Sequence, residues 1–468
     1  MLKDSFHSRR LRVCLVFPRF KYISGDPPLG IAYIASYLKE KLPDVDMSII
    51  DTTFERSLEI VRKSLEDINP DIVGIYLDTI MYTDGIRIAR MAREKGAFVV
   101  AGGPHATMAY ESVINYVDMV ILGEGEKTFT HVVETFPDIE IKSLKGVVCK
   151  RDGKRFENKD LNLTEDIDTI PIPDRNLLDM DKYIREWNYL DSVKMGTKGT
   201  TMITSRGCPY RCTFCQPTLE SIFGKKLRMR SPESVVEEMC YLKGRYSIGG
   251  IFFHDDTFTV NREWVLKFCD LVEDKGIRVL WGCNTRANTV DEKLLERMFE
   301  VGLRNIHLGI ESGSQEILDK VYNKGIMLDD VRKVVDGANR LHINVLGFFM
   351  LGAPGESEEE INKTIRLANS LKLKEATFSI TTPIPGTYLY DMVRKRGLHI
   401  SDDFTDFDYY SKRSFSGDNL TFTCLKTLQK KALFSFYMHP FRWGYVARHL
   451  VSPNGMKRLM RKVRRFVG

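Results

Sequence analysis

The chain has 468 residues, a formal net charge of +6 and 43% hydrophobic residues. One hydrophobic core rarely grows to this size, so two domains and a tail are expected. The longest apolar runs, such as residues 345–351, fall far short of the roughly 18 residues that indicate a membrane span. The start of the chain lacks a secretory apolar stretch. These features predict a cytoplasmic protein rather than an integral membrane or secreted one.

Cysteine and charge are both unevenly distributed along the chain. Nine cysteines are scattered except for one tight group of three, which does not resemble the disulfide framework of a secreted protein. Metal ligation is a better use for such a group. Residues 440–468 carry eight Lys or Arg and no acid, so the basic character belongs to the C-terminus.

The first part of the chain alternates short β-branched runs with amphipathic stretches. Five apolar runs (LRVCLVFP, MSIID, DIVGIYL, FVVAGG and MVILGEGE) are separated by helix lengths, including helices expected over 29–41 and 55–68. This pattern predicts a parallel sheet covered on both faces, a flavodoxin-like doubly wound domain over residues 1–160. Residues 161–198 contain DTIPIPDRN, whose prolines disfavour helix, and are predicted to form a linker.

The alternation of strands and helices resumes near Thr200. Six strand-like runs follow: TMITSRG, GGIFFHDD, RVLWGCNTR, NIHLGIESG, INVLGFFMLG and EATFSITTPIP. They predict a partial (β/α)6 barrel over residues 199–397, with its site at the C-terminal ends of the strands. Residues 398–468 are expected to form a small helical C-terminal region with a basic tail.

The group of three cysteines directly follows the first strand of the predicted barrel. Cys208, Cys212 and Cys215 have the spacing C-x3-C-x2-C. Thiolates this close can hold three corners of a 4Fe-4S cubane and leave the fourth iron without a protein ligand. A structural zinc site is the alternative, but zinc normally takes four protein ligands, and no His or Cys follows within about twenty residues.

This spacing, with Phe214 before the last cysteine and a barrel behind it, resembles the radical S-adenosylmethionine (SAM) superfamily. The resemblance implies a 4Fe-4S cluster whose free iron binds SAM, and a reducing electron donor such as flavodoxin or ferredoxin. It further implies reductive cleavage of SAM to a 5′-deoxyadenosyl radical that abstracts hydrogen from an unactivated carbon. In such enzymes the cofactors perform the difficult step while the protein aims the radical and excludes water.

Polar and small residues stand at the other strand ends of the predicted barrel. An acid at a strand end more often caps a helix, but shared placement after a cluster motif favours a cofactor site. The resemblance implies that Glu311 binds the ribose or the methionine ammonium of SAM, and Arg286 is suited to pair with its carboxylate. The stretch LGAPGE at 351–356 resembles the family's adenine-side turn. The predicted SAM contacts are Phe214, Asp255, Asp256, Arg286, Glu311, Ser312 and Gly313.

Three segments of the front domain, 27–38, 101–106 and 123–126, resemble the cobalamin-binding domain of the cobalamin-dependent radical SAM subfamily. They follow predicted strands, at the edge where an open α/β sheet binds its ligand. The motif D-x-H-x-x-G, which supplies a histidine to cobalt, is absent, so His105 is expected near the corrin without ligating it. A domain that no longer binds cobalamin is the alternative. The predicted contacts are Pro28, Leu29, Gly30, Gly102, Gly103, His105, Glu124, Gly125 and Glu126.

The tail bears on the partner and the substrate. Met456, Leu459, Met460 and Val463 recur at helical spacing among basic residues. Such a helix either lies on the anionic inner face of a membrane or packs on the barrel with a solvated basic face. No nucleic-acid recognition module accompanies it, so nucleic-acid binding is not expected.

The function predicted from these resemblances is cobalamin-dependent radical SAM chemistry on a small molecule, with C-methylation favoured. The Phe-Tyr-x-x-Pro pattern at 436–440 is similar to enzymes related to the anaerobic magnesium-protoporphyrin ester cyclase and to a hopanoid-biosynthesis branch. That similarity favours a lipid-like or tetrapyrrole-like substrate. A ring-forming or rearranging enzyme of the cyclase type is one alternative, and a non-catalytic sensor of cobalamin or membranes is another.

Overall fold

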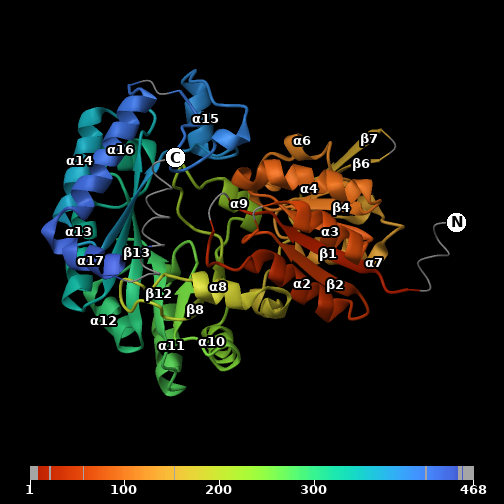
Figure 1. The fold of residues 1–468 in the computed structure, drawn as a ribbon, viewed down its shortest axis with the longest axis horizontal. Helices are drawn as coiled ribbons and strands as arrows, with labels where there is room; N and C mark the ends of the chain where they lie inside the picture. The colour runs from red at the N-terminus through yellow and green to blue at the C-terminus, as the bar shows by residue number, and fades with distance from the viewer. Residues whose placement is uncertain are drawn as a thin grey trace. The chain divides into compact units, whose positions relative to one another are not determined.

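The structure is a computed structural model, shown in Figure 1, and describes residues 9–20, 23–55, 57–151, 153–416, 419–451 and 456. Most of the predicted tail helix, including Leu459, Met460 and Val463, lies outside the described residues. The chain divides into two compact units, of which unit 1 comprises Met1–Glu186 and Pro217–Arg228. Unit 2 comprises Trp187–Gln216 and Met229–Gly468. Unit 1 therefore includes a segment that follows the three cysteines.

Unit 1 is built on a seven-stranded sheet in the order β2-β1-β3-β4-β5-β6-β7. The first five strands pair in parallel, in the flavodoxin-like order that the sequence predicts. An antiparallel hairpin, β6–β7, extends one edge of the sheet beyond the five strands of the predicted parallel sheet. The strands are β1 (Arg12–Phe17), β2 (Asp46–Asp51), β3 (Ile72–Tyr76), β4 (Phe98–Gly102), β5 (Met119–Ile121), β6 (Val147–Arg151) and β7 (Lys154–Asn158).

Helices cover both faces of this sheet, because each face carries its own apolar core. One core packs under α3 and α4, and the other packs under α2 and α7 (Figure 1). The helices of unit 1 are α2 (Leu29–Lys41), α3 (Glu59–Ile68), α4 (Tyr82–Glu94), α5 (Pro104–Met108), α6 (Tyr110–Val113), α7 (Glu126–Thr135), α8 (Met180–Glu186) and α9 (Thr218–Phe223). The strand order changes direction between β1 and β3, and open α/β sheets bind their ligands at the carboxyl edge next to such a point.

Unit 2 is built on a six-stranded parallel sheet in the order β15-β14-β13-β12-β11-β8, which matches the six predicted strand–helix repeats. These strands are β8 (Gly199–Met202), β11 (Gly250–Phe253), β12 (Leu280–Thr285), β13 (Leu303–Glu311), β14 (Asn344–Leu351) and β15 (Glu375–Ile380). Two-residue strands β9 (Ser205–Arg206) and β10 (Arg228–Met229) stand apart from this sheet.

Unit 2 contains the following helices, most of which pack on the outer face of this sheet and leave an inner face. They are α10 (Pro232–Tyr246), α11 (Arg262–Asp274), α12 (Glu292–Glu300), the π-helix η6 (Ile317–Val321), α13 (Leu328–Arg340), α14 (Glu358–Ser370), α15 (Tyr388–Lys395), α16 (Phe422–Tyr437) and α17 (Trp443–Val451). Phe253 and Trp281 point outward, against Phe268 of α11. Because strand side chains alternate, Phe252 points to the inner face. No helix among the described residues is long and apolar enough to cross a bilayer.

Trp187 closes the amino end of two neighbouring strands. A Cβ atom on Gly199 would lie 2.4 Å from the Trp187 ring, and one on Gly250 would lie 2.7 Å from it. Both strands therefore begin with glycine because the indole occupies the space of a side chain. Trp187 is fully buried and belongs to a core cluster with Leu190 and Phe252.

Replacing Trp187 with alanine removes this contact and leaves a cavity beneath β8 and β11. We expect a loss of about 3–5 kcal/mol, the usual cost of deleting a buried Trp ring. Urea denaturation followed by circular dichroism measures it as a lowered midpoint. Ile60→Ala, at an exposed position of α3, should leave the midpoint almost unchanged; equal midpoints for the two variants would contradict the role given to Trp187.

Candidate active site

The three cysteines lie on the loop between β9 and α9, and Gln216 closes this loop. The Gln216 backbone N–H donates to the Cys212 carbonyl at 2.9 Å. Its side-chain Nε2 donates to the carbonyls of Cys208 and Tyr210, both at 3.2 Å. Gln216 is buried, so these bonds are shielded from water. The protein thus shapes the loop through its own backbone groups.

The segment after η6 supports the cysteine loop from a second side. Thr213 donates from its backbone N–H to the Tyr322 carbonyl at 2.9 Å and from Oγ1 to the Val321 carbonyl at 2.7 Å. Asn323 Nδ2 donates to the Arg211 carbonyl at 3.0 Å. A loop held from two sides loses little conformational entropy when it takes up a ligand.

The three thiols are close enough to influence one another. Burial raises the pKa of Cys208, and it raises the pKa of Cys215 well above its usual value. The charges of Asp256 and Cys212 add to both shifts. Within the described residues, no three His, Cys, Asp or Glu side chains converge as a single metal ion would require. A cubane instead gives each thiolate its own iron, and this loop fits that arrangement.

Asp255 holds the chain that leads into the cysteine loop through one of its two carboxylate oxygens. Its Oδ1 accepts hydrogen bonds from the Thr204 backbone N–H and Oγ1, both at 2.9 Å, and from Ser205 Oγ at 2.5 Å. Asp255 is buried, and burial raises its pKa. Asp256, the other acid of the pair, is exposed. Of the two predicted contacts, only Asp256 has a side chain open to a ligand.

Arg286 binds the same loop from the end of β12. Its Nη1 donates to Cys212 Sγ at 3.3 Å, Nη2 donates to the Lys324 carbonyl, and Nε donates to Asn288 Oδ1 at 3.3 Å. The guanidinium also lies 3.7 Å from the centre of the Tyr210 ring. Each of its nitrogens donates to the protein, and the predicted pairing of Arg286 with the SAM carboxylate stays a prediction.

Glu311 forms a buried ion pair that the sequence analysis did not predict. Lys324 Nζ lies 2.7 Å from Glu311 Oε1, and their side chains are 7% and 8% exposed. A Cβ on Gly309 would lie 2.7 Å from both charged atoms, so the pair lies over this glycine. Glu311 has a φ of 65° at an irregularity in the β13–β14 pairing. Such strain costs on the order of 1–3 kcal/mol and is typical of functional sites.

Lys324 also faces Phe214, whose ring centre lies 5.5 Å from Nζ. It is the functional candidate that sequence reasoning missed, because a lysine in the loop YNKG carries no periodic signal. Ser312 and Gly313, by contrast, have a packing role. The Gly313 backbone N–H donates to Thr364 Oγ1 of α14 at 2.8 Å, and Ser312 is fully buried.

Glu356 holds the turn at 351–356 in shape. Its Oε2 accepts from the backbone N–H groups of Gly352 and Ala353 at 2.6 and 2.9 Å. Gly352 and Gly355 have φ values of 81° and 82°, which favour glycine. Burial raises the pKa of Glu356 to about 8, so its carboxyl group is largely protonated at neutral pH. The turn is therefore held by a buried carboxyl group that is uncharged at neutral pH.

The residues predicted to contact cobalamin gather at the carboxyl edge of the unit 1 sheet. They begin α2 (Pro28, Leu29, Gly30), end β4 (Gly102, Gly103), and connect β5 to α7 (Glu124, Gly125, Glu126). Gly103 has a φ of 102°, and a Cβ there would lie 2.8 Å from the Leu77 carbonyl. The Glu124 carboxylate is bound within unit 1 by Arg228. Glu126 is buried in the first turn of α7.

Both ring nitrogens of His105 are occupied. Thr79 Oγ1 lies 3.0 Å from Nδ1, and Ser112 Oγ lies 3.0 Å from Nε2. Because Ser112 Oγ donates its own hydrogen to the Ala109 carbonyl at 2.8 Å, we infer that Nε2 carries the imidazole proton. Burial lowers the pKa of His105 to about 4, so the ring is neutral at pH 7. The absence of a bond from His105 to cobalt stays a prediction.

Comparison with known proteins places these two sites in one family. Residues 202–368 match the radical SAM superfamily model, and residues 25–133 match the B12-binding domain model. A Pyrococcus horikoshii protein named as an uncharacterized methyltransferase is 34% identical over 447 residues, covering 92% of this chain and 93% of that protein. The chain belongs to the radical SAM superfamily.

Two further relatives bear on this cobalamin-binding radical SAM protein. The anaerobic magnesium-protoporphyrin IX monomethyl ester cyclase of Rubrivivax gelatinosus is 28% identical and covers 81% of this chain and 69% of its own length. The structure of apo OxsB, a cobalamin-dependent SAM radical enzyme, matches with a TM-score of 0.74 and 16% identity, covering 99% of this chain and 72% of OxsB. The predicted enzyme class and fold class are confirmed.

The radical SAM protein takes a 4Fe-4S cluster, SAM and cobalamin as its cofactors, as the sequence predicts. The residues present fit them. Cys208, Cys212 and Cys215 would hold the cluster on a preformed loop, with Arg286 donating to one sulfur. The Glu311–Lys324 pair offers both charges that the methionine end of SAM requires. The individual SAM and cobalamin contacts stay predictions.

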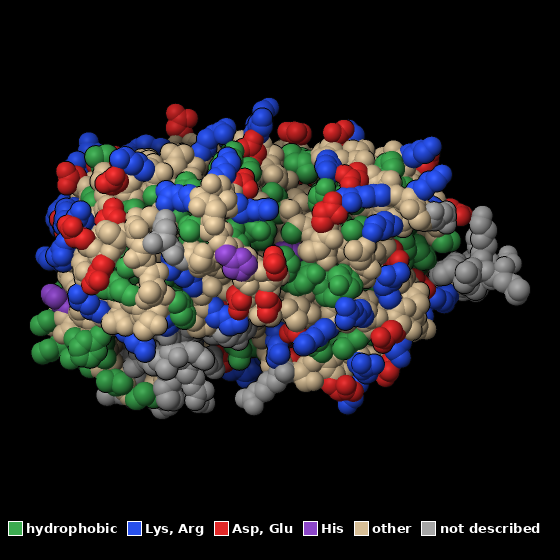
Figure 2. All heavy atoms as spheres, turned by 90° about the horizontal axis from the view of Figure 1, so that it is seen from above, with side chains coloured by type: hydrophobic (Ala, Val, Ile, Leu, Met, Phe, Trp, Pro, Cys, Tyr) green, Lys and Arg blue, Asp and Glu red, His purple; other side chains and the backbone are tan. Residues whose placement is uncertain are grey.

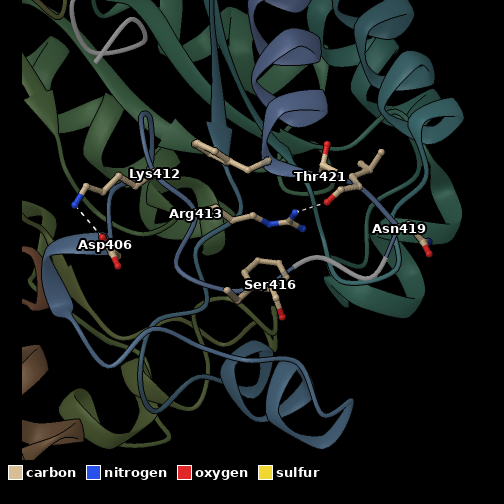
Figure 3. Close-up of a pocket in the computed structure, with 9 residues that line it drawn as sticks. Asp406, Lys412, Arg413, Ser416, Asn419 and Thr421 are labelled. Carbon is tan, nitrogen blue, oxygen red and sulfur yellow. Dashed lines mark hydrogen bonds and ion pairs between the residues drawn. The ribbon is translucent and has the colours of Figure 1, made fainter.

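A separate pocket of the radical SAM protein, of about 610 Å³, lies in the C-terminal region (Figure 3). Lys412 Nζ pairs with Asp406 Oδ1 at 2.8 Å on one side of it, and Arg413 Nη1 donates to the Leu420 carbonyl at 2.8 Å. None of the predicted site residues lines this pocket. It is therefore distinct from the cysteine loop and its neighbours.

The buried carboxyl group of Glu356 predicts a pH dependence of stability. Its folded-state pKa of about 8 lies above the ordinary value of 4.5, so the unfolded chain loses this proton first as pH rises. Stability should fall between about pH 4.5 and 8. Glu356→Gln keeps a neutral oxygen for the two N–H groups and should flatten this fall. Melting temperatures at pH 5 and pH 8.5 measure it.

The matched control is Glu358→Gln, at an exposed position two residues further on. This variant should retain the wild-type dependence of the melting temperature on pH. An unchanged dependence in Glu356→Gln would contradict the assignment of a neutral carboxyl group to the turn.

Proposed function

We propose that this protein is a cobalamin-dependent radical SAM methyltransferase that adds a methyl group to an unactivated carbon of a small molecule. The observation that carries the proposal is the presence of both sites in one chain, a preformed cysteine loop and a cobalamin-type sheet edge. The relative that spans 92% of the chain also bears the name of a methyltransferase. A reducing donor such as flavodoxin or ferredoxin would supply electrons.

When bound, the cluster, SAM and cobalamin supply the reductive cleavage of SAM and a transferable methyl group. The chain's own residues bind and orient these groups. Glu311 would accept hydrogen bonds from the ammonium of SAM, and Lys324 would donate to its carboxylate, because the two charges already lie side by side. The Arg286 guanidinium donates a hydrogen bond to the Cys212 sulfur and so orients this cysteine. Asp255 holds the start of the cysteine loop through Ser205, and Gln216 holds the loop itself through the Cys208 carbonyl.

The inner face of the unit 2 sheet supports an apolar, lipid-like substrate. Leu346, Phe348 and Met350 of β14 are only half-buried, although strands flank β14 on both sides. Their partial exposure leaves an apolar surface open on the inner face. Next to it, the Tyr189 ring stacks on Phe252 at 4.3 Å between ring centres.

The same inner face also carries a small cluster of polar side chains. The Tyr189 hydroxyl lies 2.8 Å from His254 Nε2, and the Tyr189 ring lies 5.5 Å from the His307 ring. We propose that the apolar surface binds the body of the substrate. Tyr189, His254 and His307 would bind a polar end of the substrate.

Methyl-deuterated SAM tests the proposed reaction. We expect a prenyl-lipid or tetrapyrrole substrate, incubated anaerobically with the reconstituted enzyme and a reductant, to gain a carbon-bound methyl group that carries the label. Mass spectrometry of the product measures the transfer. Cys212→Ala, which removes one cluster thiolate, should give neither labelled product nor 5′-deoxyadenosine.

Consumption of the substrate with formation of 5′-deoxyadenosine but no labelled methyl group would contradict methylation. That result would favour the second candidate, a ring-forming or rearranging enzyme. The relative named as a magnesium-protoporphyrin ester cyclase, which aligns over 81% of this chain, is the observation that supports this candidate. A sensor that performs no catalysis would be supported only if Cys212→Ala kept the full biological effect.

We further propose that the C-terminal helices contact an anionic membrane surface. Phe434, Met438, Trp443 and Leu450 are 69%, 53%, 57% and 47% exposed. Figure 2 shows apolar side chains gathered at its left edge, the side on which α16 and α17 lie in Figure 1. Residues 419–468 contain eleven Lys or Arg and no acid. Exposed apolar side chains within a purely cationic segment match an anionic interface.

Vesicle sedimentation tests this contact. The full chain should bind vesicles that contain phosphatidylglycerol and should not bind pure phosphatidylcholine, and added salt should weaken the binding. The variant Phe434→Ala/Trp443→Ala should bind more weakly. Tyr409→Ala, 38% exposed at a position outside these helices, serves as the control. Wild-type binding by the double variant, or no binding by the wild type, would contradict the proposal.

A further inference from the structure

The short helix α9 follows the last cysteine by only two residues, yet it belongs to unit 1. It packs against α5, which directly follows β4. A Cβ on Gly123, in the loop after β5, would lie 3.1 Å from the Ile222 carbonyl of α9. Both of these connections lie at the carboxyl edge of the sheet. The helix therefore rests on the edge where a doubly wound sheet binds its ligand.

A buried ion pair fixes α9 in this position. Arg228 Nη1 lies 3.0 Å from Glu124 Oε2, and Nη2 lies 2.7 Å from Oε1. The two side chains are 7% and 2% exposed, so the pair is shielded from water. Arg228 also donates to the Phe223 carbonyl of α9 at 2.8 Å and to the Thr164 carbonyl at 2.6 Å. A bidentate pair with additional acceptors sets a single geometry.

The outer side of α9 is apolar and partly open. Leu219 and Phe223 stand four residues apart, so they lie on one side of the helix. Both are half-buried, whereas Ile222 is buried against unit 1. A corrin ring presents a broad, largely apolar plane with amide groups at its rim, and an apolar helix face is suited to pack on such a plane.

We infer that α9 forms one wall of the cobalamin site and that the Arg228–Glu124 pair positions it. Glu124 then acts through Arg228, as a positioning residue, and its carboxylate makes no direct contact with the corrin. The inference rests on cobalamin binding by this protein. Because only Gln216 and Pro217 separate Cys215 from α9, a corrin that orders α9 also restrains the end of the cysteine loop. Linkage makes this effect reciprocal, so a loaded cluster should strengthen corrinoid binding.

Titration with hydroxocobalamin, followed by absorption spectroscopy, tests the inference on the full chain. Phe223→Ala and Arg228→Met should each bind hydroxocobalamin at least about tenfold more weakly than the wild type. Iron content after reconstitution should stay at the wild-type level in Phe223→Ala, since this residue holds no cluster ligand. Ile60→Ala, at an exposed position of unit 1, should bind as the wild type does.

Phe223→Ala decides the outcome, because removing one charge of the buried Arg228–Glu124 pair can unfold unit 1. The melting temperature of the corrinoid-free variant shows whether unit 1 stays folded. Wild-type affinity in Phe223→Ala would overturn the inference about α9 and leave cobalamin binding intact. Failure of the wild type itself to bind hydroxocobalamin would instead overturn cobalamin binding by this chain.

Discussion

Burial of charge at the carboxyl edge of the unit 2 sheet is the constraint on which the site depends. An unpaired buried charge costs several kcal/mol, so each one must find partners in the loops around it. Asp255 takes its donors from the chain before the cysteines, Arg286 donates to the cysteine loop, and Lys324 pairs with Glu311. Satisfying these charges fixes the loops, so the site is preorganised before any cofactor binds.

Unit 1 also buries ionisable side chains at the carboxyl edge of its sheet. One of them is a neutral histidine, and two others form an ion pair. His105 stays uncharged between two hydroxyl groups, and burial keeps its pKa low. Glu124 keeps its charge but is neutralised by Arg228, a residue about a hundred positions further along the chain. The first arrangement places a protein hydroxyl group at each imidazole nitrogen. The second joins the segment after the cysteines to the cobalamin-binding unit.

The periodic features of this protein could be predicted from its sequence, and the long-range ones could not. Apolar runs at regular spacing indicated the five parallel strands of unit 1 and the six strands of unit 2, and the cysteine spacing indicated the cluster loop. The assignment of α9 to unit 1, the donors of Asp255 and the Lys324–Glu311 pair depend on contacts between distant residues. No local pattern encodes such contacts, so the sequence predicts Asp255 and Glu311 as SAM contacts but not the hydrogen bonds and the ion pair that they form within the protein.

The central claim is that three cysteines hold a 4Fe-4S cluster with one iron left for SAM. Electron paramagnetic resonance of the reduced, reconstituted protein, recorded with and without SAM, tests it most directly. The account predicts about four irons per chain and a cluster signal that SAM shifts, with the signal lost in Cys208→Ala, Cys212→Ala and Cys215→Ala alike. A signal that SAM leaves unchanged, or one that survives removal of any of these cysteines, would contradict it.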